Sequence, residues 1–400
     1  MAHDRALDAL AKVCGGTRPG TADDAVQGVA PALVAAPATV QEASEVLRVA
    51  AEHGLTVVPR GAGTRLHWGM PPHRCDLLVD TRGLNRIVEH AAGDLVVKVE
   101  AGLPVDRLAE TLSAAGQRLA LDTPLPGSTV GGTLATAAAG PLRLRYGTPR
   151  DLVIGVTMVR ADGVLAKAGG KVVKNVAGYD LGKLLTGSYG TLGLIVEAAF
   201  RLHPVPRARA YVTAPVPDGA HAHKAVQAVL HSTVMAAALE VDAPADGPIT
   251  LCVLVEGVPA GVTALTDQVV RLLGDEAAVA EQPPEWWGAA PPGETLIEFT
   301  TEPAELPHVL STLAGTDVRG SAGSGTWQLA LPAGTGPDEA GALLTTLRSL
   351  GHAVVRTAPD ELRERLDLWG PVPALDLMRR VKDQFDPDHR LSPGRFAGGI

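Results

Sequence analysis

Residues 125–147 read LPGSTVGGTLATAAAGPLRLRYG, and this stretch, which we call the cradle, organises the rest of the chain. Glycine lets the main chain approach a ligand closely and adopt conformations closed to other residues. Successive backbone N–H groups in such a loop form a nest for anionic oxygens. The cradle therefore predicts a backbone-built anion site that is neither helix nor strand. Its side-chain-free points and hydroxyl donors are Gly127, Gly131, Gly132, Gly140, Gly147, Ser128, Thr129, Thr133 and Thr136.

Two more glycine-rich turns flank the cradle in the sequence. The first, VPRGAGT at residues 58–64, follows a short apolar stretch at 55–58 that we expect to be a strand. The third, GSYGTLG, lies at residues 187–193. A strand that leads straight into a glycine-rich turn is a common way to place backbone donors against phosphate groups. Three such loops in one half of the chain predict a large phosphate-bearing cofactor.

Length and composition limit the class of protein. A chain of 400 residues predicts two or more domains, and its 46% hydrophobic residues can build a substantial core. The formal net charge of -9 argues against nucleic acid as a partner, because binding to a phosphate backbone needs a basic face. The three widely spaced cysteines form no disulfide or metal-binding pattern, which favours a reducing compartment.

The same sequence carries no apolar signal segment at its start and no apolar run long enough to span a bilayer. We therefore expect a cytoplasmic protein, either free or held at a membrane through a complex.

Periodicity divides the chain into three parts. Residues 1–205 mix short strands with helices such as the one expected after Thr39, a possible N-cap, and include a hairpin at Asp162-Gly163. The run HPVP at 203–206 marks a boundary. Residues 206–370 show two successive βαββα(β) patterns, which predict a ferredoxin-like α+β domain that is duplicated internally. Residues 371–400 hold a helix at 375–385 and a turn-rich end that we expect to return to the first domain.

Five of these motifs, in this order along the chain, resemble the FAD-linked oxidases of the vanillyl-alcohol oxidase type, also called PCMH-type. Within that family they are most similar to the small flavin-binding subunits of bacterial glycolate oxidase. The motifs are PRGAGT (59–64), PGSTVGGTLATAAAG (126–140), RYGTPRDLVIGV (145–156), KVVKNVAGYDLGKLLTGSYGTLGLI (171–195) and FDPDHRLSPGRF (385–396).

The resemblance implies an α+β fold, with an FAD-binding domain of two α+β subdomains and a cap domain over the flavin ring. It implies that the first turn lines the pyrophosphate, that the cradle contacts the second phosphate and the ring, and that the third turn lies on the adenosine side. Lys174 could stabilise negative charge on the flavin, as a cation near a developing anion does, or lie on a surface helix. The expected cofactor-binding residues are Pro59, Arg60, Gly61, Ala62, Gly63, Thr64, Pro126, Gly127, Ser128, Thr129, Gly131, Gly132, Thr136, Gly140, Lys174, Gly190, Thr191, Gly193 and Ile195.

The resemblance also implies an oxidoreductase that takes a hydride from a small 2-hydroxy acid such as glycolate. Arg145 would bind the carboxylate, and Tyr146 or Tyr179 the hydroxyl. Electrons would pass to an iron-sulfur subunit in a complex with a larger flavin subunit. Some relatives attach FAD to a histidine just after the first glycines, where this chain has Thr64 and only later His67. We therefore expect noncovalent FAD.

Relatives that oxidise 2-hydroxy acids often carry a histidine-rich metal site in the cap, whereas the cap histidines here are scattered and predict no metal. This difference keeps open a noncatalytic FAD-bearing assembly or electron-relay subunit. A flavin oxidase of sugar alcohols or nucleotide sugars is a third hypothesis.

Several residues have two interpretations. Arg143 and Arg150 could face solvent or hold an anion, and Tyr179 and Asp180 could be core and capping residues. Trp286 and Trp287 could anchor their loop or bind a partner.

Overall fold

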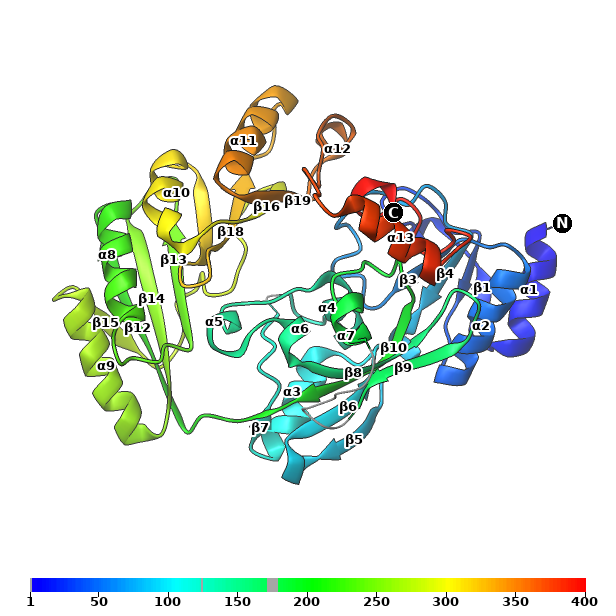
Figure 1. The fold of residues 1–400 in the computed structure, drawn as a ribbon, viewed down its shortest axis with the longest axis horizontal. Helices are drawn as coiled ribbons and strands as arrows, with labels where there is room; N and C mark the ends of the chain where they lie inside the picture. Colours follow the sequence, from blue (N-terminus) through cyan, green and yellow to red (C-terminus); the bar gives the residue numbers. More distant parts are fainter. Residues whose placement is uncertain (1, 124, 171–178) are drawn as a thin grey trace. The chain divides into compact units, whose positions relative to one another are not determined.

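The computed structural model describes residues 2–123, 125–170 and 179–400, which form two compact units (Figure 1). The first unit comprises Met1–Ala138, Thr148–Pro204 and Pro371–Ile400, and the second comprises Ala139–Gly147 and Val205–Gly370. This division differs from the expected boundaries at Val205, which belongs to the second unit, and inside the cradle. Residues 139–147, the second part of the cradle, belong to the second unit.

The first subdomain of the first unit is a small sheet covered by two helices. Its strand order is β1-β2-β4-β3, in which β2, β4 and β3 run parallel. Thr39 ends the preceding loop and begins the expected helix, since its side chain accepts a hydrogen bond from the Glu42 N–H at 3.1 Å. The elements are α1 (Ala2–Val13), β1 (Thr17–Pro19), β2 (Leu33–Ala35), α2 (Val40–Glu52), β3 (Val57–Arg60) and β4 (Leu77–Asp80).

The second subdomain is an antiparallel sheet in the order β5-β6-β10-β8-β9. Its core is built from Val, Leu, Ile and Phe200, with which helices α3 and α4 pack. The two subdomains confirm the expected α+β fold. The elements are β5 (Ile87–Ala91), β6 (Val96–Glu100), α3 (Val105–Ala114), β7 (Gln117–Arg118), α6 (Pro149–Leu152), β8 (Val153–Val159), β9 (Leu165–Gly169), α7 (Leu181–Leu185), β10 (Leu194–Arg201) and β11 (His203–Pro204).

The prediction that the cradle is neither helix nor strand is wrong. It contains the short helices α4 (Val130–Thr136) and α5 (Arg143–Tyr146). The Thr129 side chain caps α4 by accepting from the Gly132 N–H, and Ala137 ends the helix in the left-handed conformation, with φ 53°. We expected the glycines to keep this segment irregular, but Gly131 and Gly132 lie inside the capped helix. Gly131 has a packing role there, because the lack of a side chain lets α4 approach Ala101 closely.

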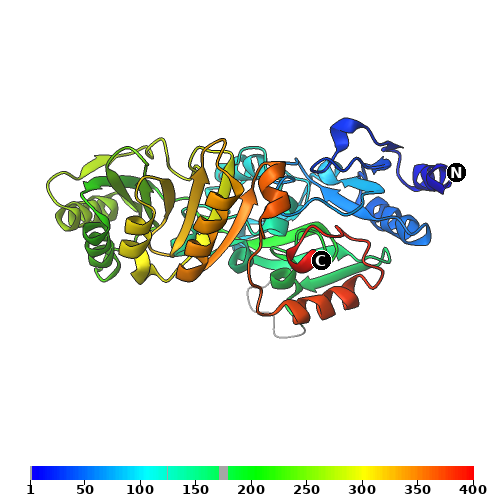
Figure 2. The same cartoon turned by 90° about the horizontal axis from the view of Figure 1, so that it is seen from above.

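The second unit holds the expected internal duplication. Each repeat has the order βαββαβ, and eight strands join in one sheet with the order β15-β12-β14-β13-β17-β18-β16-β19. Its helices lie along one side of the sheet (Figure 2), and α8 of the first repeat contacts α10 of the second. The elements are β12 (Ala208–Val216), α8 (Gly219–Leu230), β13 (Ala238–Ala243), β14 (Ile249–Gly257), α9 (Pro259–Leu273), β15 (Ala278–Ala280), β16 (Thr295–Thr300), α10 (Leu306–Thr312), β17 (Asp317–Ser321), β18 (Thr326–Leu331), α11 (Pro337–Leu350), β19 (His352–Thr357) and α12 (Asp360–Arg365).

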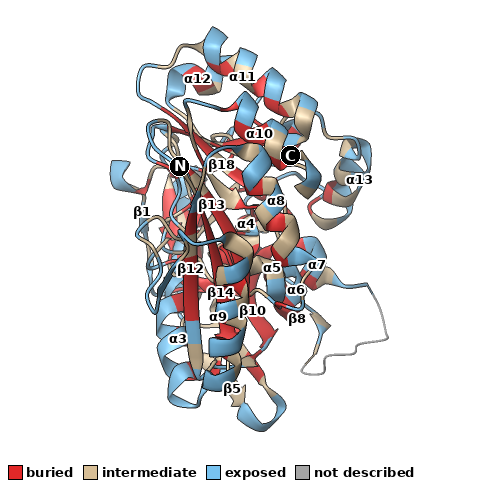
Figure 3. Ribbon diagram, turned by 90° about the vertical axis from the view of Figure 1, so that its left-hand side faces the viewer, coloured by how far each residue is buried: buried red, intermediate tan, exposed pale blue. Residues whose placement is uncertain are grey.

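The middle strands of this sheet are largely buried (Figure 3). The cluster around Tyr211 and Cys252 is joined by Leu142 and Tyr146 from residues 139–147 and by the two adjacent tryptophans. The Trp287 ring meets the Tyr211 ring edge-on at 5.1 Å between centroids. Trp286 and Trp287 therefore anchor their own loop to the sheet.

The chain end returns to the first unit. Helix α13 (Leu375–Phe385) is followed by a strand-like pairing in which the Val57 N–H donates to the Arg390 carbonyl and the Ser392 N–H donates to the Val57 carbonyl, both at 2.8 Å. The end of the chain thus lies beside β3, the strand that leads into the first glycine-rich turn. Within the ranges that the structure describes, no helix is long and apolar enough to cross a membrane.

We predict that Thr39→Ala destabilises the first unit by about 1 kcal/mol, because α2 loses its N-terminal capping bond. Chemical denaturation followed by circular dichroism measures this change. Thr111→Ala is the control, since exposed Thr111 bonds only to the Arg107 carbonyl within α3 and alanine favours a helix. Equal losses in the two variants would contradict the capping role of Thr39.

Candidate functional site

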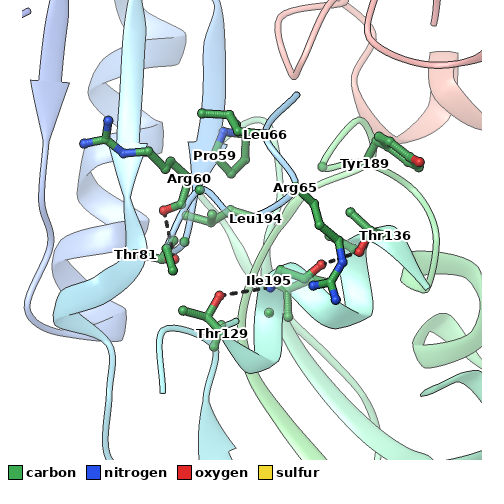
Figure 4. Close-up of a pocket in the computed structure, with 18 of the residues that line it drawn as sticks. Pro59, Arg60, Arg65, Leu66, Thr81, Thr129, Thr136, Tyr189, Leu194 and Ile195 are labelled. Carbon is green, nitrogen blue, oxygen red and sulfur yellow. Dashed lines mark hydrogen bonds between the residues drawn. The ribbon is translucent and has the colours of Figure 1, made fainter. Parts of the chain in front are cut away.

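A cleft in the first unit lies where the three glycine-rich turns meet (Figure 4). The first turn enters directly from β3, the cradle contributes α4, and the third turn precedes β10. Of the expected cofactor residues, the cleft is lined by Pro59, Arg60, Gly61, Ala62, Gly63, Thr64, Thr129, Gly131, Gly132, Thr136, Gly190, Gly193 and Ile195.

The other expected cofactor residues do not line this cleft. Ser128 lies behind it, where its hydroxyl contacts Thr64 and Arg65. The Gly127 N–H donates to Asp106, and Thr191 bonds back to the Ser188 carbonyl. Pro126 lies in the same loop as Gly127, and Gly140 belongs to the second unit. Lys174 lies outside the described residues.

Two glycines allow the walls of the cleft to approach each other. A methyl group on Gly61 would collide with the Thr129 hydroxyl. A methyl group on Gly131 would lie 2.7 Å from the Ala101 Cβ and 3.0 Å from the Ala101 carbonyl oxygen, closer than van der Waals contact. Since part of the Ala101 contact is backbone, it cannot rotate away. The first turn and α4 are therefore held together by the absence of side chains.

Arg65 brings a buried positive charge into the cleft. Its guanidinium donates to the Ser128 hydroxyl at 3.1 Å and to the Thr123 hydroxyl, and lies 5.4 Å from the centroid of the Trp68 ring. Its Nε is buried without a hydrogen-bond partner. In the described part of the chain, Arg65 makes no ion pair with a carboxylate.

Arg395, from the returning chain end, is the second buried cation. It donates from one nitrogen to the carbonyls of Leu66 and Trp68 at 2.9 and 2.8 Å. Its other terminal nitrogen is buried without a partner, and no carboxylate pairs with it among the residues described. Burial lowers the pKa of both Arg65 and Arg395 to about 10, so both guanidinium groups remain charged at neutral pH.

Arg60 behaves differently from these two arginines. Its guanidinium extends away from Arg65 (Figure 4) and forms ion pairs with Asp80 at 3.0 Å and Asp24 at 3.3 Å. Its charge is therefore already neutralised by acidic groups of the protein. Arg60 lines the cleft, but its positive charge is not available to a ligand in the way that the charges of Arg65 and Arg395 are.

The cleft fits a diphosphate-bearing group. Buried charges in proteins are normally paired, so two buried guanidinium groups without carboxylates leave a strong preference for an anion. Arginine is suited to phosphate oxygens because it presents several donors in a fixed plane. The glycine-lined walls of the first turn and α4 bring backbone close to the same space.

Sequence reasoning missed Arg65, Arg395 and Tyr189. Arg65 directly follows the PRGAGT motif, and Arg395 lies inside the terminal FDPDHRLSPGRF motif. The two motifs were therefore the sequence signal that could have identified these arginines. Tyr189 lies within the third turn, has a positive φ of 55°, and contacts Phe396 at 5.3 Å between ring centroids. The pairing of distant segments, which only the fold shows, identifies these three residues.

The expected catalytic residues Arg145 and Tyr146 lie in the second unit, on α5. The Tyr146 hydroxyl donates to the Glu256 carboxylate at 3.2 Å. The Arg145 side chain is exposed, stacks 5.5 Å from the Tyr146 ring centroid, and donates at 3.5 Å to the Met235 carbonyl. No described carboxylate forms an ion pair with Arg145. This unit therefore presents a guanidinium that lacks an ion pair among the described residues, beside a hydrogen-bonded phenol.

The remaining candidates show little organisation. Tyr179 is 93% exposed, and Asp180 caps α7 by accepting from the Lys183 N–H at 3.2 Å. Arg143 donates to the carbonyls of Ala139 and Gly140. His221 contacts Asp218 at the exposed start of α8. The described residues contain no group of three or more His, Cys, Asp or Glu that could hold a metal ion.

Two family models match this chain. Residues 31–169 match the FAD binding domain, and residues 368–396 match the C-terminal domain of FAD linked oxidases. These two ranges contain the first turn, the cradle, Arg65 and Arg395. The expected cofactor, FAD, is thereby confirmed.

Three sequence relatives extend the comparison. An uncharacterized FAD-linked oxidoreductase of Mycobacterium tuberculosis is 29% identical over 92% of this chain and 91% of the relative. A glycolate oxidase subunit of Bacillus subtilis is 34% identical over 52% of this chain and 45% of the relative. A mitochondrial D-lactate dehydrogenase [cytochrome] of Saccharomyces cerevisiae is 35% identical over 44% of this chain and 31% of the relative. The chain thus spans less than half the length of the two relatives with named substrates.

The fold is also that of a solved structure. A p-cresol methylhydroxylase with substrate bound superposes with a TM-score of 0.75 and 16% identity, covering 98% of this chain and 96% of the other. At this identity the similarity establishes the fold alone, and it confirms the expected PCMH-type architecture.

We predict that Gly131→Ala weakens FAD binding at least tenfold, because the added methyl group pushes α4 away from Ala101. The dissociation constant, measured by quenching of flavin fluorescence, tests this. Gly93→Ala is the control, since a Cβ at Gly93 meets nothing within 4 Å. An unchanged affinity in Gly131→Ala would show that the close approach is irrelevant to the cofactor.

We predict that Arg65→Met and Arg395→Met each raise the dissociation constant for FAD by about 10- to 100-fold, as expected for loss of one charge-assisted contact of about 1.5–3 kcal/mol. Arg60→Met should instead lower stability and affect affinity less, because it leaves Asp24 and Asp80 without their shared partner. Thermal unfolding and FAD titration of the three variants separate these effects. A larger affinity loss in Arg60→Met than in the other two would reverse the assignment.

Proposed function

We propose that this chain, which matches the FAD binding domain over residues 31–169 and the C-terminal domain of FAD linked oxidases over residues 368–396, oxidises a small 2-hydroxy acid of the glycolate or lactate type. As an FAD-linked oxidoreductase it has the required cofactor. The observation that supports the substrate class is the similarity of about half of the chain to a glycolate oxidase subunit and to a D-lactate dehydrogenase. Both names contain a 2-hydroxy acid, in which a hydroxyl-bearing carbon lies next to a carboxylate.

The bound FAD supplies the acceptor for the hydride that leaves the hydroxyl-bearing carbon. In the proposal, Arg65 and Arg395 hold the FAD diphosphate, and the backbone of residues 61–63 and 131–132 lines the same anion. Thr64 occupies the position after the first glycines, and its hydroxyl contacts Ser128 at 3.2 Å. A threonine hydroxyl there favours noncovalent FAD.

Arg145 is the residue that we assign to the substrate carboxylate. Its exposed guanidinium makes no ion pair with any described acid, and arginine binds carboxylates through two parallel hydrogen bonds. Tyr146, whose single phenolic proton is donated to Glu256, would accept a hydrogen bond from the substrate hydroxyl through its oxygen. Glu256, which already accepts from Tyr146 at 3.2 Å, would orient the phenol for this contact. Tyr179 is a secondary candidate for binding the substrate hydroxyl, because its side chain is almost fully exposed.

The route of the electrons is part of the same proposal. Two electrons collected by FAD would pass to an iron-sulfur subunit, within a complex that includes a larger flavin subunit of the glycolate oxidase type. The alternative is a subunit that binds FAD without oxidising substrate and relays electrons for that larger subunit. An enzyme of sugar alcohols or nucleotide sugars is distinguished from both by its reducing substrate.

We predict that the purified, FAD-loaded chain bleaches at its flavin absorption bands under anaerobic glycolate or D-lactate. Arg145→Met should raise KM for the acid by at least tenfold and change kcat less, because the charge acts mainly on binding. Bleaching only after partner subunits are added would support the relay alternative. Bleaching by a sugar alcohol and not by any 2-hydroxy acid would overturn the substrate class.

A further inference from the structure

A buried ion pair lies between α13 and the end of the chain. The Lys382 ammonium and the Asp386 carboxylate are 2.6 Å apart, and both side chains are at most 1% exposed. A charged pair without access to water is costly to form unless its remaining hydrogen-bonding capacity is used. The neighbours of this pair therefore indicate what it holds in place.

The Lys382 ammonium uses all three of its protons. Besides Asp386, it donates to the Thr191 carbonyl and to the Leu391 carbonyl, both at 2.8 Å. Asp386 in turn accepts from the Leu391 N–H at 2.7 Å. One ammonium group thus connects the third glycine-rich turn, which contains Thr191, with the returning end of the chain.

Both connected segments line the cofactor cleft. The third turn places Tyr189 and Gly190 at the cleft, and the chain end places Arg395 there, four residues beyond Leu391. The residues on either side of Leu391 pair with Val57, which precedes the first turn. Neither Lys382 nor Asp386 lines the cleft itself.

We propose that the Lys382–Asp386 pair is a positioning device for FAD, which fixes the third turn and the Arg395-bearing chain end at the spacing that the cofactor needs. The inference rests on FAD as the cofactor and adds residues that do not touch it. Burial lowers the pKa of Lys382, while Asp386 opposes that shift. The pair acts through Thr191 and Leu391 and takes no part in the chemistry.

The decisive variant replaces both partners, Lys382→Met together with Asp386→Leu. Replacing a buried pair by apolar residues of similar volume leaves no unpaired charge, so the fold is expected to persist. The bonds to Thr191 and Leu391 are nevertheless lost. We expect the dissociation constant for FAD to rise at least tenfold, and amide hydrogen exchange at residues 187–193 and 391–396 of the FAD-free protein to become faster.

The control is Lys98→Met together with Glu197→Leu, which removes an ion pair of 2.8 Å between β6 and β10 of the same unit; neither residue lines the cleft. Its FAD affinity should stay within twofold of the wild-type value. A Lys382→Met/Asp386→Leu variant that is stable and binds FAD as tightly as the wild type overturns the proposal, because a purely structural pair predicts that result.

Asp386→Asn, with thermal unfolding measured alongside, provides a second test. It removes the carboxylate charge and keeps an acceptor for the Leu391 N–H, so we expect a several-fold weaker affinity for FAD and faster exchange at Leu391. Unchanged values of both quantities would also overturn the proposal. Failure of the wild-type chain itself to bind FAD would instead remove the cofactor assignment, which keeps the two failures distinct.

Discussion

Two guanidinium groups that are buried without carboxylates set the central constraint on this protein. Arg65 and Arg395 come from opposite ends of the chain and meet in one cleft. Solvation by water is lost to both, and backbone carbonyls and hydroxyls replace only part of it. In the proposed site the anionic diphosphate of FAD would supply the counter-charge that these two side chains lack.

The same constraint explains why the end of the chain must be ordered. A cation on a frayed terminus would remain hydrated and would contribute little to the binding of an anion in the cleft. Here the terminal segment pairs with Val57 in β3, and the Lys382 ammonium joins it to the third turn. The buried pair fixes the backbone at Leu391, and this backbone carries Arg395. The Arg395 charge is thereby held in the same cleft as the third turn, which lies about two hundred positions earlier in the sequence.

Much of this could be predicted from sequence, and what could not has clear physical reasons. Periodicity located α13 to the residue and found both repeats of the second unit, because apolar positions recur in these elements with the spacing of a helix or of a strand. It failed for α4, where capping by Thr129 outweighed two glycines. The motifs indicated FAD, yet they listed Arg60 as a phosphate ligand, since ion pairs with Asp24 and Asp80 are visible only once β3 and β4 are adjacent. The roles of Arg145 and Tyr146 stay predictions.

The duplicated sheet of the second unit has a consequence for how that unit could exist in pieces. The repeats meet through β13 and β17, the equivalent second strands of each repeat, which run antiparallel. A fragment with only one repeat would expose that strand as an unpaired edge, a ready template for self-association. The polypeptide link between the repeats thus converts a surface prone to aggregation into the seam of a continuous sheet.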